Sequence, residues 1–159
     1  ARFGVAIVYS HEAQALETAG GIAHALALLG DASFAAVNAD VFSDYDYVQL
    51  AQAVDRLQQS RFAAHLVLVD NPDHHADGDF ALQEEQVVLD GARLTFSGIA
   101  AYRPAMFSGI TRGAKAGLAP LLHEHIAAGR VSGERYGGRW RDIGTPARLA
   151  EINGELAAP

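Results

Sequence analysis

Short apolar runs without polar alternation recur along the first half of the chain. Such runs are typical of strands that are buried on both faces of a sheet. Segments with apolar residues three or four positions apart separate them, and that spacing indicates helices. The pattern predicts the order β-α-β-α-β. The predicted strands are Phe3 to Tyr9, Phe34 to Asn38 and His65 to Asp70, and the helical faces are Ile22, Leu26 and Leu29, then Val48, Ala51, Val54 and Leu57.

In the second half of the chain, apolar and polar residues alternate more often and the predicted elements are shorter. After the turn-rich Asn71 to His75, the sequence predicts a hairpin from Phe80 to Leu89 and a further strand over Leu94 to Ala101. A short helix at Pro104, an amphipathic helix over Leu118 to Ile126 and a pair of strands around Gly137-Gly138 follow. The last predicted helix is capped by Thr145, opens with Pro146 and buries Leu149, Ile152 and Leu156.

These elements predict an α/β fold with a mostly parallel sheet, flanked by helices and carrying a small hairpin insertion. The chain has 159 residues, and 50% of them are hydrophobic, so one core and a single domain over residues 1–159 are expected. A strand that starts almost at residue 1, without an initiator Met or a signal-peptide pattern, suggests a carboxyl-terminal fragment of a longer domain.

The charge balance narrows the classes of partner. The formal charge is -7 and Lys115 is the only lysine, which argues against a surface that follows nucleic-acid phosphates. The chain has no cysteine, which excludes disulfides and thiolate metal sites, and we expect a cytoplasmic protein. No apolar run approaches the roughly 20 residues that a membrane span needs.

Three aspartates directly follow predicted strands: Asp40, Asp70 and Asp142. Ligands of open α/β sheets bind off the carboxyl ends of the strands, so these carboxylates are candidates for a site. Asp40 and Asp142 could share Mg²⁺, which prefers one or two carboxylates together with phosphate oxygens and water. The spacing alone leaves open the alternative that each aspartate only starts a turn or caps a helix.

Other motifs are less specific. Gly20-Gly21, predicted to lie just before the first helix, would let a flat or anionic ligand approach free N–H groups, although such a pair is more often only a turn. His123 and His125 face different sides of a helix and do not form a zinc motif. His74 and His75 lie in a polar loop, where solvated turn residues are the simpler interpretation.

Taken in order, several stretches along the whole chain resemble the sugar-1-phosphate nucleotidyltransferases, in particular their N-acetylmuramate 1-phosphate uridylyltransferase branch. The stretches are Leu16 to Gly21, Val37 to Asp40, His65 to Pro72 with His74-His75, Gly78 to Phe80, Leu94 to Ile99, Leu118 to Leu122, Val131 to Glu134 and Trp140 to Thr145. The resemblance implies a Rossmann-like fold of the glycosyltransferase-A type. It also implies transfer of a nucleoside monophosphate from a nucleoside triphosphate to a sugar 1-phosphate, with release of pyrophosphate.

The resemblance further implies roles for individual residues. Asp40 and Asp142 would hold Mg²⁺ between the nucleotide and sugar phosphates. The nucleobase and sugar contacts that it implies are Ala19, Gly20 and Gly21 for the base, and Asp79, Ser97 and Gly98 for the sugar. Positioning and charge neutralisation would do most of the catalytic work.

The chain departs from the family pattern in three places. Ala39 replaces the glycine usual between Asn38 and Asp40, and Ala19 stands where relatives often carry a glycine. The glycine-rich phosphate loop of the family belongs ahead of residue 1, so this chain is expected to be inactive alone. Lys115 is the only lysine that could replace the lysine of the missing segment.

Two other functions stay open. Mannose-1-phosphate guanylyltransferases share the same metal aspartates, so the sequence also allows GTP and a mannose phosphate. A non-catalytic module that binds sugar nucleotides is the second alternative, and a generic α/β domain would require the ordered match to be chance. No partner beyond the two substrates is implied, and the oligomeric state cannot be read from the sequence.

Overall fold

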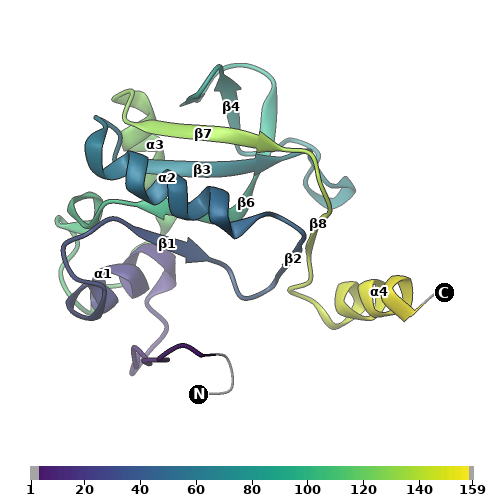
Figure 1. The fold of residues 1–159 in the computed structure, drawn as a ribbon, viewed down its shortest axis with the longest axis horizontal. Helices are drawn as coiled ribbons and strands as arrows, with labels where there is room; N and C mark the ends of the chain where they lie inside the picture. The colour runs from purple at the N-terminus through teal and green to yellow at the C-terminus, as the bar shows by residue number, and fades with distance from the viewer. Residues whose placement is uncertain (1–3, 158–159) are drawn as a thin grey trace.

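The computed structural model describes residues 4–157, which form a sheet with helices on both sides (Figure 1). Most predicted elements are present. In chain order they are α1 (Glu17–Leu29), β1 (Phe34–Val37), β2 (Val41–Ser43), α2 (Tyr47–Gln59), β3 (Ala64–Val69), η1 (Asp73–His75), β4 (Phe80–Gln83), β5 (Gln86–Val88), β6 (Arg93–Tyr102), η2 (Pro104–Phe107), α3 (Leu118–Ala127), β7 (Val131–Tyr136), β8 (Trp140–Asp142) and α4 (Pro146–Ala157).

The main sheet is mixed, which corrects the expectation of a mostly parallel sheet. Its strand order is β1-β6-β3-β7-β5-β4, and β4 also pairs with β6. Strand β6 lies between β1 and β3 and runs antiparallel to both, whereas β3 and β7 run parallel. A strand buried on both faces has the same apolar run in either direction, so the sequence pattern could not reveal that β6 enters the sheet in reverse. The α/β class itself is confirmed.

The core has two parts, one on each face of the sheet. Leu66 and Leu68 of β3 pack with residues of α1 and α3, while Val67 between them packs with Leu50 and Leu57 of α2. Successive side chains of a strand point to opposite faces, so one apolar run supplies both cores. Figure 1 shows α2 in front of the sheet, with α1 and α3 behind it.

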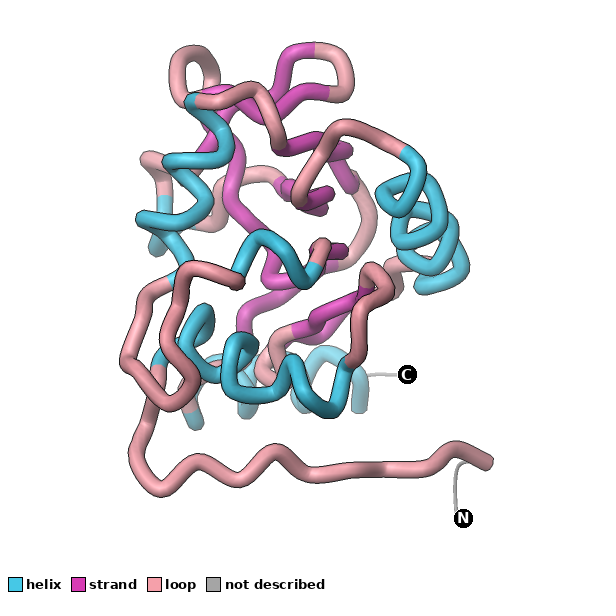
Figure 2. The backbone as a smooth tube through the Cα atoms, turned by 90° about the vertical axis from the view of Figure 1, so that its left-hand side faces the viewer, coloured by secondary structure: helices cyan, strands magenta, loops and turns pink. Residues whose placement is uncertain are grey.

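The first described residues form an irregular extended segment, not the strand predicted there. Val5, Ile7, Val8 and Tyr9 are 58–86% exposed, and the segment runs away from the sheet (Figure 2). Phe3, at the start of the predicted strand, lies outside the described residues. No strand within residues 4–157 pairs with this segment, so its apolar pattern is not used in the sheet.

Helices α1 and α2 each differ from the prediction in one respect. Helix α1 starts at Glu17, so Gly20 and Gly21 lie inside it. Helix α2 is capped by Asp46, whose carboxylate accepts a hydrogen bond from the Val48 N–H at 3.0 Å. Its buried face is Leu50, Ala53 and Leu57, whereas Val48 is exposed.

Helix α4 buries only Ile152 of its three predicted core residues, since Leu149 and Leu156 are 43% and 53% exposed. In Figure 1 it lies beyond the small β2–β8 sheet, away from the main core. The strands around Gly137-Gly138 are both present but do not pair with each other, because β7 joins β3 and β8 joins β2. Across residues 4–157, every helix is too short or too polar to cross a membrane.

Candidate active site

The two-stranded β2–β8 sheet brings Asp40 and Asp142 together from distant parts of the chain. Asp40 directly precedes β2, Asp142 ends β8, and Val41 is the register partner of Asp142. The Ile143 N–H also donates to the Asp40 carbonyl at 2.8 Å. The structure thus places the two aspartates side by side, and their role as metal ligands stays a prediction.

Both carboxylates converge on Gly144. A Cβ placed on Gly144 would lie 2.8 Å from Asp40 Oδ2, too close for nonbonded atoms, and 3.0 Å from Asp142 Oδ1, a very tight contact. The absence of a side chain at Gly144 thus lets the two carboxylates share one small space. Such an arrangement concentrates negative charge, which a cation would neutralise.

Asp142 is held as a carboxylate by several donors. The Gly144 N–H, which donates to Oδ1 at 2.8 Å, is the largest cause of a lowered pKa for Asp142. Burial opposes this effect, while the Arg148 guanidinium and the His74 ring lower the pKa further. Arg148 donates to Oδ2, and His74 Nε2 is 3.6 Å from the same oxygen. Asp142 is therefore anionic at neutral pH.

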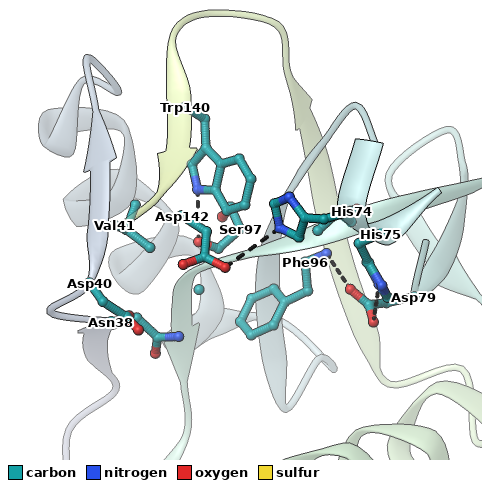
Figure 3. Close-up of a pocket in the computed structure, with 12 residues that line it drawn as sticks. Asn38, Asp40, Val41, His74, His75, Asp79, Phe96, Ser97, Trp140 and Asp142 are labelled. Carbon is teal, nitrogen blue, oxygen red and sulfur yellow. Dashed lines mark hydrogen bonds and ion pairs between the residues drawn. The ribbon is translucent and has the colours of Figure 1, made fainter. Parts of the chain in front are cut away.

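A cavity of about 340 Å³ opens beside these carboxylates (Figure 3). Its walls come from the residues after β1, the start of β2, the interior of β6, strand β8 and the segment between β3 and β4. The lining residues are Asn38, Asp40, Val41, His74, His75, Asp79, Thr95, Phe96, Ser97, Gly98, Trp140 and Asp142. A larger hollow of about 710 Å³ continues from His74 and Asp142 towards Arg148 and helix α4.

Asp79 is fixed at the side of the cavity opposite Asp40. Its Oδ2 accepts a hydrogen bond from the Phe96 N–H at 2.8 Å, and its Oδ1 lies 3.1 Å from His75 Nε2. The backbone N–H of Asp79 donates to the Leu94 carbonyl at 2.8 Å. Both oxygens and the backbone are therefore held, so the carboxylate has a defined position.

Ser97 and Gly98 form the floor of the cavity in different ways. Ser97 is 1% exposed, and its hydroxyl donates to the Val67 carbonyl at 2.7 Å. Gly98 has a φ of +77°, and a Cβ there would lie 2.7 Å from the Asn38 side-chain amide. Gly98 therefore allows the Asn38 side chain to lie against the backbone of β6.

Several predicted site residues lie elsewhere. Ala19 and Gly20 are buried in α1, and the Gly20 N–H donates to the Ala116 carbonyl at 3.0 Å, so it is not the free donor that the sequence suggested. The nucleobase role of Ala19, Gly20 and Gly21 stays a prediction. Asp70 lines the larger hollow but not the cavity of about 340 Å³, and it pairs with Arg135 at 2.7 Å. Lys115 pairs with Glu17 at 3.1 Å.

The structure also adds residues that the sequence did not single out. His74 and His75, interpreted as solvated turn residues, both line the cavity. Trp140 contributes its indole, whose Nε1 donates to the Ser97 carbonyl at 3.0 Å. The histidines follow the carboxyl end of β3, and that position is the signal that could have drawn attention to them.

The donor set suits a magnesium ion that a substrate helps to bind. Two carboxylates converge on one point, and Mg²⁺ takes its remaining ligands from phosphates and water. Within residues 4–157, no group of three His, Asp or Glu side chains is placed to enclose a metal by itself. Asp40 and Asp142 are therefore the residues that would hold the ion.

Two curated relatives match nearly the whole chain. It is 48% identical over 154 residues to the N-acetylmuramate alpha-1-phosphate uridylyltransferase of Neisseria meningitidis, covering 94% of this chain and 66% of the relative. It is 29% identical over 161 residues to the enzyme of the same name from Caulobacter vibrioides, covering 91% and 66%. The chain thus spans 66% of the length of each of these relatives, just under two thirds. No protein-family model matches it.

Solved structures share the fold at low sequence identity. One is a protein from Bacillus anthracis assigned as a glucose-1-phosphate thymidylyltransferase, in complex with sucrose. Its TM-score is 0.79 at 17% identity, over 99% of this chain and 68% of that one. Another is the UTP-bound UGPase from Acinetobacter baumannii, with a TM-score of 0.68 at 17% identity, over 92% and 59%.

The fold is the Rossmann-like nucleotidyltransferase fold, and the paired aspartates lie at its small β2–β8 sheet. The chain belongs to the sugar-1-phosphate nucleotidyltransferase family, as the resemblance predicted. Within that family, the curated relatives it is similar to are N-acetylmuramate alpha-1-phosphate uridylyltransferases.

Proposed function

We propose that the full-length protein transfers uridylate from UTP to N-acetylmuramate 1-phosphate and releases pyrophosphate. The observation that carries this proposal is the 48% identity to the Neisseria meningitidis enzyme of that name, over 94% of the chain. The convergence of Asp40 and Asp142 on Gly144 supports it, because two carboxylates beside a polar cavity suit a metal-assisted reaction of phosphates. Such an activity would serve the recycling of cell-wall sugars.

In the proposed reaction, an oxygen of the sugar phosphate attacks the α-phosphorus of UTP in line. The new P–O bond forms as the bond between the α-phosphorus and the bridging oxygen of the β-phosphate breaks, so pyrophosphate leaves with the electron pair. No covalent enzyme intermediate is required. The main task of the protein is therefore to align two anionic substrates.

Asp40 and Asp142 are the proposed ligands of Mg²⁺. When bound, the ion would neutralise phosphate charge that otherwise opposes the approach of two anions. The chain prepares Asp142 for this role through the Gly144 N–H and Arg148, which both keep it anionic. Arg148 contacts Oδ2 and is therefore a positioning residue for the carboxylate.

The sugar is proposed to bind in the cavity of about 340 Å³, between the two aspartates and Asp79. Asp79 is fixed by Phe96 and His75 and can accept hydrogen bonds from sugar hydroxyls. Ser97 would contact the sugar through its backbone, since its hydroxyl already donates to the Val67 carbonyl. Gly98 offers a surface without a side chain.

A substrate panel tests the proposal. Pyrophosphate release by the full-length gene product is measured with Mg²⁺, each of the four common nucleoside triphosphates, and either N-acetylmuramate 1-phosphate or mannose 1-phosphate. Turnover with UTP and the muramate sugar is expected. Turnover only with GTP and mannose 1-phosphate would identify a guanylyltransferase instead, and no turnover with any pair would favour a binding module.

A further inference from the structure

The charged side chains of the cavity are arranged at two ends. Asp40 and Asp142 lie at one end, where they converge on Gly144. His75 and Asp79 lie at the other, beyond Asp142 as seen from Asp40 (Figure 3). His74 belongs to the first end, because its Nε2 is 3.6 Å from Asp142 Oδ2. Among the described lining residues, His75 is therefore the side chain of the second end that can donate a hydrogen bond to an anion.

His75 is held in place by its neighbours. Its Nε2 lies 3.1 Å from Asp79 Oδ1, and the other oxygen of Asp79 accepts the Phe96 N–H at 2.8 Å. The side chain is still 41% exposed, so a ligand can reach it. The contact with Asp79 uses Nε2, and Nδ1 is the nitrogen that a ligand would contact.

The proposed substrate has two anionic groups on different parts of its ring. N-acetylmuramate 1-phosphate carries a phosphate at C1 and, at O3, a lactyl ether that ends in a carboxylate. N-acetylglucosamine 1-phosphate has the same phosphate but only a hydroxyl at C3. If the phosphate lies at the end with Asp40 and Asp142, the lactyl group extends away from it across the ring.

We propose that His75, oriented by Asp79, selects sugar phosphates that carry a carboxylate at the far end of the cavity. This inference rests on the proposed function and names the residue that would give it specificity. In the complex, the ring donates one N–H to Asp79 and the other to the lactyl carboxylate. A charge-assisted hydrogen bond of this kind discriminates strongly against a sugar without the carboxylate.

The test compares the preference between two sugars in wild type and in one variant. The kcat and KM of the full-length protein are measured with UTP and either N-acetylmuramate 1-phosphate or N-acetylglucosamine 1-phosphate, for wild type and His75→Gln. We expect the preference for the muramate sugar, as a ratio of kcat/KM, to fall about tenfold or more in His75→Gln. The loss should appear mainly as a higher KM for the muramate sugar. His123→Gln, an exposed histidine on α3 outside the cavity, is the matched control and should keep the wild-type ratio.

Equal losses with both sugars would overturn the proposal, because they would place His75 on the shared phosphate or in the fold. An unchanged ratio would overturn it as well. If N-acetylglucosamine 1-phosphate reacts too slowly, calorimetric dissociation constants of both sugar phosphates provide the same comparison. Failure of the proposed function is a separate result, since wild type would then release no pyrophosphate from UTP and N-acetylmuramate 1-phosphate.

Discussion

Glu134 is a charged residue outside the candidate site that contributes to the stability of the fold. His65, whose Nε2 is 4.0 Å from Oε1, is the main cause of a lowered pKa for Glu134, and the Tyr45 hydroxyl, which donates to the same oxygen, adds to it. A carboxylate with a lowered pKa stabilises the folded state above its unfolded pKa, and this contribution is lost as the pH falls through the folded pKa.

We therefore expect Glu134→Gln to lower the free energy of unfolding by about 1 kcal/mol at pH 7. The difference from wild type should shrink below about pH 4, near the ordinary pKa of a glutamate, as Glu134 itself becomes protonated. Urea unfolding at a series of pH values measures both effects. Glu84→Gln, in the exposed hairpin turn, is the control. A difference that stays constant down to pH 3 would contradict this assignment.

Gly144 controls the spacing of the two site carboxylates. A methyl group at this position would lie within 2.8 Å of Asp40 Oδ2 and 3.0 Å of Asp142 Oδ1. Both atoms are ends of side chains and can move, so the fold should tolerate Gly144→Ala while the carboxylates are pushed apart. We expect a higher Mg²⁺ concentration for half-maximal turnover and a melting temperature near that of wild type.

The matched control is Gly137→Ala, because an added methyl group there has no atom within 4 Å. Its Mg²⁺ dependence should equal that of wild type. If Gly144→Ala also shows wild-type Mg²⁺ dependence, then the convergence of the carboxylates on Gly144 does not define the metal site.

Helix α1 is positioned by a close backbone approach at Gly20. A Cβ at Gly20 would lie 2.5 Å from the Ala114 carbonyl oxygen and 3.0 Å from the Ala116 nitrogen, and both belong to backbone that cannot turn aside. Gly20→Ala should therefore destabilise the full-length protein by about 1–3 kcal/mol. At Gly21 an added Cβ meets only the Glu12 side chain, so Gly21→Ala should be neutral or stabilising.

Thermal unfolding of both variants measures the difference. Equal melting temperatures for Gly20→Ala and Gly21→Ala would contradict the close approach of α1 to residues 114–116. The two glycines thus have distinct structural surroundings, although the sequence places them side by side.

The elements show which parts of the fold could be predicted from the sequence. The run at β3 and the hairpin β4–β5 were predicted because strong local patterns define them. The direction of β6 was not, since a doubly buried strand has no local signal for its partner's direction. In helix α4 the local pattern was correct but the burial was not: its apolar residues have helical spacing, yet only Ile152 of the three is buried.

For the candidate site, position after a strand selected Asp40 and Asp142, which line the cavity, but it selected Asp70 as well. Asp70 instead pairs with Arg135 on the neighbouring strand. The pairing of β2 with β8 joins residues about a hundred positions apart, and it brings Asp142 and not Asp70 beside Asp40. Such a long-range pairing cannot be predicted from local sequence. His75 was missed because a histidine in a polar loop has no periodicity to interpret.

At the scale of the whole molecule, two exposed features stand at the amino-terminal side of the fold. Val5, Ile7, Val8 and Tyr9 are exposed, and β1 pairs with a strand on one side only within the described sheet. The chain spans 66% of the length of each curated relative, so catalytic activity is to be measured on the full-length protein.

The most direct measurement is Mg²⁺-dependent pyrophosphate release from UTP and N-acetylmuramate 1-phosphate by the full-length protein and its Asp142→Asn variant. Asparagine keeps the oxygen that accepts the Gly144 N–H, so the fold should be retained, with a somewhat lower melting temperature because the ion pair with Arg148 is lost. We predict that turnover falls at least about a hundredfold, the scale of losing one electrostatic contact at a reaction centre. Asp40→Asn should behave alike. Turnover within a few-fold of wild type in either folded variant would contradict the proposal that these two carboxylates hold the catalytic metal.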